Sequence, residues 1–156
     1  MTTLLPELHE NQATGRIADI YDEIRRFSGV PYVSSLQRFL ATLPGVLEWA
    51  WDAVRPALVS GAIQETGWRL ARDARIGRSA PMPAAVRAGA DVAAIRNIAG
   101  NFVRVSPVNL MTGACLGCLL TGAVPAGTGF PAGWTPPAML PPMPGHADPA
   151  ALDPAT

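Results

Sequence analysis

The chain has 156 residues and a formal net charge of zero, because its 12 basic residues, all arginine, balance 12 acidic ones. A length near this value fits one domain that buries roughly 70% of its unfolded surface. Without a basic excess, the sequence argues against a nucleic-acid-binding surface, which has to neutralise phosphates.

The first predicted helix follows Thr14, a suitable N-cap, and ends at Gly29, which can adopt the left-handed conformation of a C-terminal stop. Apolar residues recur along it at helical spacing: Ile17, Ile20, Tyr21, Ile24 and Phe27. Asp22 and Arg26 on the opposite face are spaced as an i,i+4 ion pair. We therefore expect this helix to bury one face and to expose a charged one.

Two more helices are predicted before residue 62. Pro31 is expected to open the second helix, which runs to Leu43 and is broken by Pro44–Gly45. The third helix is predicted over residues 46–62. Pro56 is expected to kink or divide it, because proline lacks a backbone donor and clashes with the preceding turn.

A fourth helix is predicted over residues 64–76, followed by a turn at 79–83 and a short helix near 84–88. Asp91 is a good N-cap for a further helix over 92–104. No alternating apolar runs bounded by hairpin turns occur, so strands are not expected. The predicted fold class is all-α, a helical bundle.

Ser106 and Pro107 have the N-cap and N1 chemistry that starts a separate last helix, which is predicted to reach Leu120. This helix has almost no polar face, which is typical of the central, buried helix of a bundle.

A membrane span is the alternative for residues 108–124. Asn109, two threonines and three glycines in that run, and the proline-rich segment after it, favour a buried helix instead. Apolar surface that a chain of this size cannot cover also predicts a dimer or aggregation.

The chain is expected to divide into an N-terminal arm (1–13), a helical domain (14–122) and a Pro/Gly/Ala-rich irregular linker or tail (123–156). The N-terminus lacks a basic region followed by an apolar run, so no export signal is predicted and a cytoplasmic location is expected. The histidines at 9 and 146 have no metal-ligand spacing, and neither a metal nor a cofactor is predicted.

The order of signals over residues 15–56 (GRIADIYDEIRRFSGVPYVSSLQRFLATLPGVLEWAWDAVRP) resembles the first repeat of the group I 2-haloacid dehalogenases, also called the halocarboxylic acid dehydrogenase family. Residues 92–120 resemble the same family, and the tail from Leu140 is similar to the connector before the family's second repeat. The resemblance implies an all-helical fold of two related repeats, a pseudo-dimer distantly similar to alkylhydroperoxidases. This chain is long enough for one repeat.

The resemblance implies hydrolysis of the carbon–halogen bond of 2-haloalkanoic acids by a water that a carboxylate activates. The family's catalytic aspartate belongs to the second repeat, and its counterpart here falls near Leu36, beside Ser35, so the base is not matched. Ser106 matches a polar residue before proline that helps to hold the water, and Tyr32 matches an aromatic residue of the pocket. Ser106 as a helix cap and Tyr32 as a core residue remain open alternatives.

Cys115 and Cys118 form a CxxC pair, which in alkylhydroperoxidase-like helical proteins is a redox centre. Those proteins carry an upstream glutamate and a histidine four residues after the second cysteine, whereas position 122 here is glycine. No base is therefore placed to lower a thiol pKa. Small apolar residues that let helices approach closely are the alternative interpretation of this pair.

Three hypotheses result from the sequence. The chain is a half-length or truncated 2-haloacid dehalogenase-like protein, inactive alone and completed by a second repeat or by self-association. Alternatively, it is a CxxC redox protein, or a non-catalytic helical dimerisation module. The expected partner of the first is a small halogenated carboxylic acid, whereas no nucleic acid and no membrane are expected.

Overall fold

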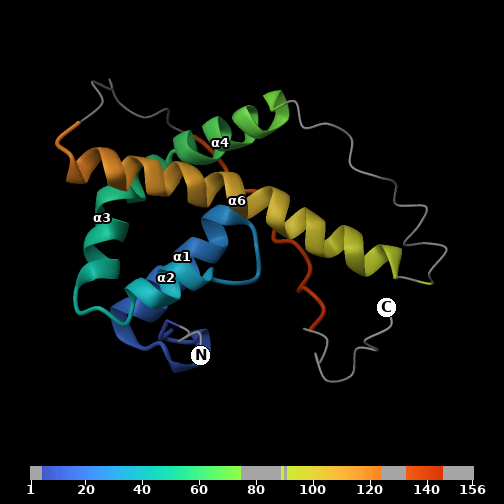
Figure 1. Ribbon diagram of the computed structural model, residues 1–156, viewed down its shortest axis with the longest axis horizontal. Helices are drawn as coiled ribbons and strands as arrows, with labels where there is room; N and C mark the ends of the chain where they lie inside the picture. The colour runs from blue at the N-terminus through green and yellow to red at the C-terminus, as the bar shows by residue number, and fades with distance from the viewer. Residues whose placement is uncertain (1–4, 75–88, 90, 124–132, 146–156) are drawn as a thin grey trace.

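The structure, a computed structural model, describes residues 5–74, 89, 91–123 and 133–145 (Figure 1). Within these residues every regular element is a helix and no strand is present, which confirms the all-α class. The predicted turn at 79–83 and short helix near 84–88 lie outside the described residues. The elements are η1 (Glu10–Gln12), α1 (Gly15–Ser28), α2 (Ser35–Leu40), α3 (Val46–Val59), α4 (Ala62–Asp73) and α6 (Val92–Leu120).

The two clearest helix-end signals form as predicted. Gly29 ends α1 with φ of 65°, and its N–H donates to the Arg25 carbonyl at 2.8 Å. Asp91 caps α6, where its carboxylate accepts from the N–H groups of Ala93 and Ala94 at 2.9 and 3.1 Å. The predicted ion pair of Asp22 with Arg26 is wrong, because Asp22 bonds to Arg25 one residue earlier.

The second and third helices differ from their predicted bounds. α2 begins at Ser35 rather than at Pro31, and Ser34 stands at its N-cap position. Pro56 does not divide α3, which continues to Val59. The proline lies close to the C-terminal end, where the helix stops three residues later and few backbone bonds depend on it.

The predicted start of a new helix at Ser106 is wrong, because α6 runs unbroken through Pro107. α4 makes its most extensive contacts with α6 and lies against it at Pro107. Gly67 of α4 lies so close that an added Cβ would be 2.9 Å from the Pro107 carbonyl oxygen. Next to it on α4, the Trp68 indole N–H donates to the Arg104 carbonyl of α6 at 2.9 Å. Tertiary contacts thus hold a helix that local signals would interrupt.

The buried residues of α6 lie in the middle of the helix, on both sides of Pro107. Val105 is 5% exposed and Val108 is 3% exposed, so both face the other helices. Asn101 completes the buried set of α6. The fully buried residues of α6 thus lie in a short stretch, and beyond it Met111, Cys115 and Leu116 pack partly buried against the core.

The hydrophobic core lies between α1, α3 and the middle of α6. Burial there follows from the apolar spacing of each helix, since residues three and four positions apart share one face. Its buried members are Ile20, Tyr21, Ile24, Phe27, Val33, Leu47, Trp51, Val54, Leu58, Ile63 and Val108. α1 and α3 supply most of them, and Trp134 from the C-terminal part packs against the edge of this cluster.

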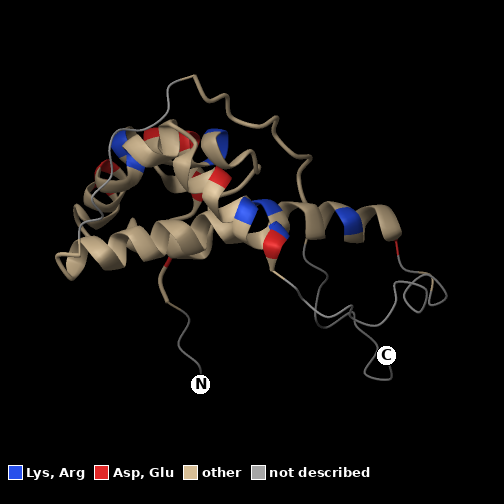
Figure 2. Ribbon diagram, turned by 90° about the horizontal axis from the view of Figure 1, so that it is seen from above, with Lys and Arg blue, Asp and Glu red and all other residues tan. Residues whose placement is uncertain are grey.

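The expectation that the last helix is buried is wrong. α6 crosses the helical part between α4 and α1 (Figure 1), and its C-terminal half carries no charged residue (Figure 2). Large apolar side chains point outward along it, among them Val103, Leu110 and Leu120, which are 68%, 72% and 72% exposed. Within the described part of the chain, α6 is the one helix long and apolar enough to cross a membrane, and 11% of its apolar stretch is buried.

Two segments outside the α-helices pack against them. In the N-terminal arm, the carboxylate of Glu10 in η1 accepts from the Val33 N–H at 2.8 Å and pairs with Arg25. Near the C-terminus, residues 133–145, here called the strap, cross α6 and reach the end of α1 (Figure 1). The strap is irregular, as its prolines predict, but it lies on the helical domain.

Candidate functional site

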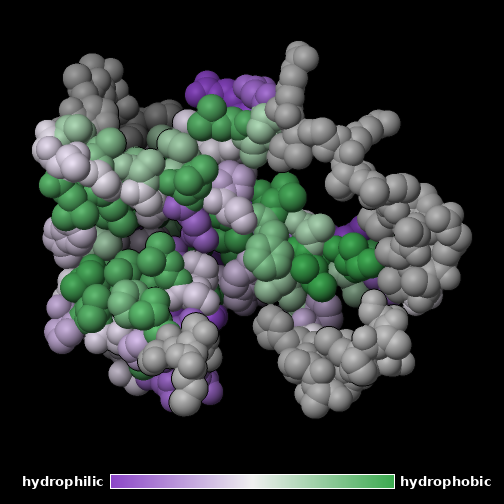
Figure 3. Space-filling model, in the orientation of Figure 1, coloured by the Kyte–Doolittle hydropathy of each residue, from purple (hydrophilic) through white to green (hydrophobic). Residues whose placement is uncertain are grey.

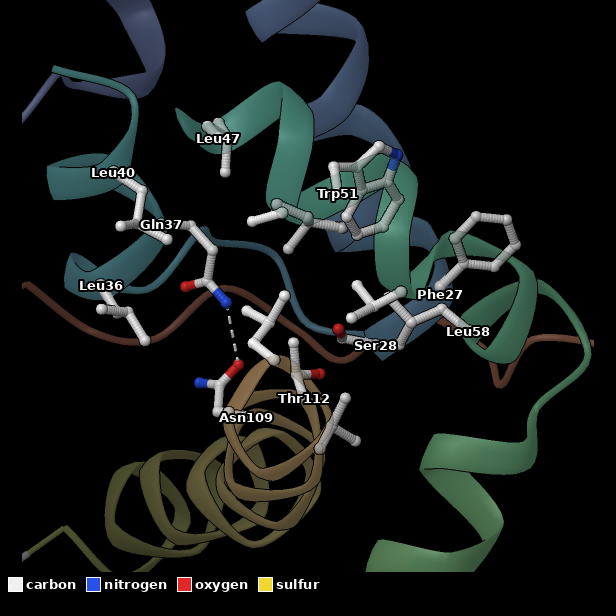
Figure 4. A pocket seen from close by; sticks show the side chains of 16 residues that line it. Phe27, Ser28, Leu36, Gln37, Leu40, Leu47, Trp51, Leu58, Asn109 and Thr112 are labelled. Carbon is white, nitrogen blue, oxygen red and sulfur yellow. Dashed lines mark hydrogen bonds between the residues drawn. The ribbon is translucent and has the colours of Figure 1, made fainter. Parts of the chain in front are cut away.

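An apolar pocket opens between α1, α2, α3 and α6 (Figure 4). The space open to the centre of a water-sized sphere is about 50 Å³, enough for roughly three or four such groups. Leu36 at its edge is 53% exposed, so the pocket reaches solvent beside α2. Its walls are mostly aliphatic and aromatic, with the rings of Phe27 and Trp51 stacked at a centroid distance of 6.5 Å.

A ring of three hydrogen bonds joins α2 to α6 at the pocket. The Gln37 amide N–H donates to the Asn109 side-chain oxygen at 3.1 Å, as the dashed line in Figure 4 shows. The Asn109 amide donates to the Ser34 hydroxyl oxygen at 3.3 Å, and this hydroxyl donates to the Gln37 side-chain oxygen. Each amide nitrogen carries two hydrogens and gives one to the ring, so one on each is left for a ligand.

The residues that line this pocket include no acid, base or thiol. Its polar side chains are Ser28, Gln37, Asn109 and Thr112, none of which titrates near neutral pH. A water held there would have no carboxylate or imidazole of the lining to accept its proton. The pocket can therefore bind and orient a small molecule, but its lining supplies no general base.

A carboxylate lies behind the pocket wall, against Trp51. Glu23 accepts from the Trp51 indole N–H at 2.8 Å and from two nitrogens of Arg55 at 2.9 and 2.6 Å. These hydrogen bonds, that of Arg55 first, lower the pKa of Glu23 to about 2. A carboxylate with this pKa and these partners is a weak base, so Glu23 positions the indole and does not activate water.

Replacing Glu23 with glutamine is expected to lower the free energy of unfolding by about 1 kcal/mol at pH 7. Because the folded-state pKa of Glu23 is depressed, its contribution is complete above the unfolded value near 4.5 and is lost as pH falls toward about 2. Chemical denaturation of both proteins between pH 7 and pH 2 checks this. The difference between them should shrink across that window; a constant difference would contradict the assignment.

The three residues suggested by the resemblance do not come together at the pocket. Ser35 is exposed, and its hydroxyl accepts from Arg38 at 3.2 Å. Ser106 is exposed on a separate apolar hollow between α4 and α6. Tyr32 is partly buried, its hydroxyl has no hydrogen-bond partner within the described residues, and burial raises its pKa. None of the three lines the pocket of Figure 4.

Cys115 and Cys118 lie one turn apart on α6, and both are free and partly buried. Burial, and secondarily the neighbouring Cys118, raises the pKa of the Cys115 thiol. A raised pKa reduces the thiolate fraction on which redox attack depends. Within the described ranges, no group of three or more His, Cys, Asp or Glu side chains is placed to hold a metal ion.

Sequence reasoning missed Gln37 and Asn109 as a pair. The sequence presents Asn109 only as a polar residue in an apolar run, and Gln37 carries no distinguishing signal in the second helix. Their contact joins residues that are 72 positions apart, and no local pattern indicates it. The available signal was the one amide in the apolar run over residues 107–120, which needs a partner if it is buried.

Comparison with known proteins gives no further guide to the site. No model of a known protein family matches the chain, and no curated protein or solved structure is significantly similar to it.

Proposed function

We propose that this chain binds a small, largely apolar acid in the pocket between α2 and α6, as the substrate-holding half of a 2-haloacid dehalogenase-like protein. The observation that carries the proposal is an apolar pocket with two amide groups and no titratable side chain in its lining. Apolar walls suit a halogen and an α-carbon. The remaining amide hydrogens of Gln37 and Asn109 suit the oxygens of a carboxylate.

The pocket's size supports a ligand of few atoms. Space for roughly three or four water-sized groups matches the smallest 2-haloacids and is too small for an extended chain. The pocket lining has no cation, so a carboxylate would be held by neutral donors alone. We expect weak binding, with the apolar walls contributing in proportion to the buried area.

Hydrolysis in this proposal requires a general base from a second unit. The residues along α6 provide a surface for one: Thr112 and Leu116 line the pocket, while Leu119 and Leu120 nearby are 38% and 72% exposed. Figure 3 shows further apolar side chains gathered on the visible face. A second repeat or a second copy packed on these residues would cover them and bring its own side chains near the pocket.

The proposal predicts that the purified chain binds 2-chloropropionate but releases no halide from it. Nuclear magnetic resonance titration should show shifts of the Asn109 side-chain amide, and Asn109→Ala should weaken binding by about 1 kcal/mol. Ser106→Ala, outside the pocket, is the matched control and should leave binding unchanged. Halide release by the chain alone, above the rate without protein, would contradict the missing base.

Sedimentation of the same samples shows whether the second unit is another copy of this chain or a separate repeat. Self-association that is reversed by Leu119→Glu and Leu120→Glu would support a second copy as the completing unit. A monomer that binds 2-chloropropionate would support a separate second repeat. If the chain self-associates and binds no haloacid, the non-catalytic dimerisation module is the better conclusion.

A further inference from the structure

The strap is held by a row of side chains on one face of α6. Asn97, Asn101 and Arg104, here called the α6 ladder, follow one another at intervals of four and three residues and so share a face. Each donates to a backbone carbonyl of the strap. The bonds are Arg104 to Ala138 at 2.7 Å, Asn101 to Pro141 at 3.4 Å and Asn97 to Pro142 at 2.7 Å. The Asn101 bond is the weakest, because the same amide nitrogen also donates to the two oxygens of Asn97 at 2.9 and 3.0 Å.

The ladder and the strap run in opposite directions, since Arg104, Asn101 and Asn97 meet Ala138, Pro141 and Pro142 in turn. From Asn97 to Arg104 an α-helix rises about 10 Å. From Ala138 to Pro142 an extended chain with about 3.1 Å per residue spans about 12 Å. The two ends of the ladder therefore reach the two ends of this stretch, while the carbonyls of residues 139 and 140 between them are not bonded by the ladder.

Donors on the ladder suit the chemistry of proline, which has a carbonyl but no backbone N–H. One N–H of the strap, that of Leu140, donates to the Gly29 carbonyl at 3.0 Å. Gly29 also permits the close approach, because an added Cβ would lie 2.8 Å from the Pro137 ring. The strap is thus bonded to α6 through its carbonyls and to the end of α1 through an N–H.

Trp134 anchors the other end of the strap. Its ring lies over Gly61, where an added Cβ would come within 2.4 Å of three ring atoms, and its indole N–H donates to Glu65 at 3.3 Å. Residues 133–145 contain no charged side chain, so the attraction to α6 is dipolar and apolar. Salt should therefore affect it little.

We propose that the α6 ladder, together with Gly29 and Gly61, is a binding site for proline-rich extended peptides, and that the strap is its resident ligand. The site recognises free carbonyls of an extended proline-rich chain that a tryptophan precedes. This recognition is independent of the pocket between α2 and α6. A peptide with the sequence of residues 133–145 is the occupant that the contacts specify.

The test uses the full chain with its own strap weakened by Trp134→Ala and Pro137→Ala. A labelled synthetic peptide of residues 133–145 is titrated into it, and binding is followed by fluorescence anisotropy. The peptide should bind this variant at least tenfold more tightly than the unaltered chain, whose tethered strap competes at an effective concentration in the millimolar range. Adding Asn97→Ala or Arg104→Ala should weaken binding about tenfold, the loss expected for one good hydrogen bond.

Arg96→Ala is the matched control, since Arg96 is an exposed arginine of the same helix and makes no hydrogen bond to the described strap. It should leave peptide binding unchanged, and circular dichroism should show equal helix content in all variants. A second measurement needs no weakened strap: Arg104→Ala in the otherwise unaltered chain should speed hydrogen exchange at the Leu140 N–H about tenfold. Absence of peptide binding, or equal effects of Arg96→Ala and Arg104→Ala, would overturn the proposal.

Discussion

Replacing Trp51 with alanine is expected to lower the free energy of unfolding by about 3–5 kcal/mol, the usual cost of deleting a buried aromatic side chain. Trp51 is 5% exposed, stacks on Phe27 and donates its indole N–H to Glu23. Its loss would leave a cavity beside the pocket and would remove one hydrogen-bond donor from Glu23. Urea denaturation followed by circular dichroism measures the effect.

Trp49→Ala provides the control for this substitution on the same helix. Trp49 is 48% exposed, so its removal deletes little buried surface. The expected change is within about 1 kcal/mol, as for most exposed positions. Similar losses for the two tryptophans would show that α3 does not present the Trp51 face to the core.

Gly67→Val is expected to destabilise the fold by about 2–3 kcal/mol, because overpacking at a tight helix crossing forces backbone shifts. An added Cβ there would meet the Pro107 carbonyl oxygen at 2.9 Å and the carbonyl carbon at 3.0 Å. These are backbone atoms, which cannot rotate away as the end of a side chain can. The free energy of unfolding from chemical denaturation measures the loss.

Gly117→Val on α6 is the matched control, since nothing lies within 4 Å of a Cβ added at Gly117. We expect a change within about 0.5 kcal/mol, because valine is no worse than glycine in an exposed helix. Equal destabilisation at the two positions would argue that valine acts through helix propensity and that α4 does not cross α6 closely at Gly67.

Local signals predict the parts of the fold that depend on neighbouring residues. Gly29 and Asp91 end and begin helices through contacts within a few positions, and both are recognisable in the sequence. The helix break predicted at Pro107 is wrong because α4 lies against it, and Gly67 carries no sequence mark of that contact. Apolar surface that the chain cannot cover was expected from its size, but the sequence does not indicate which part of α6 the other helices cover, because that is a tertiary property.

The candidate site is less predictable than the fold. Tyr32, Ser35 and Ser106 are suggested by a resemblance, and the structure does not bring them together. Gln37 and Asn109 meet because α2 and α6 both pack against α3, which is a tertiary property. The proline content predicts an irregular strap, but its docking depends on two glycines far from it in the chain.

The hydrogen-bonded ring of Ser34, Gln37 and Asn109 is built from hydroxyl and amide groups that neither gain nor lose protons across the physiological range. The link between α2 and α6 at the pocket is consequently insensitive to acidity. Cosolvents that imitate an amide would compete for its donors and acceptors and loosen it, whereas mild acidification would leave it intact.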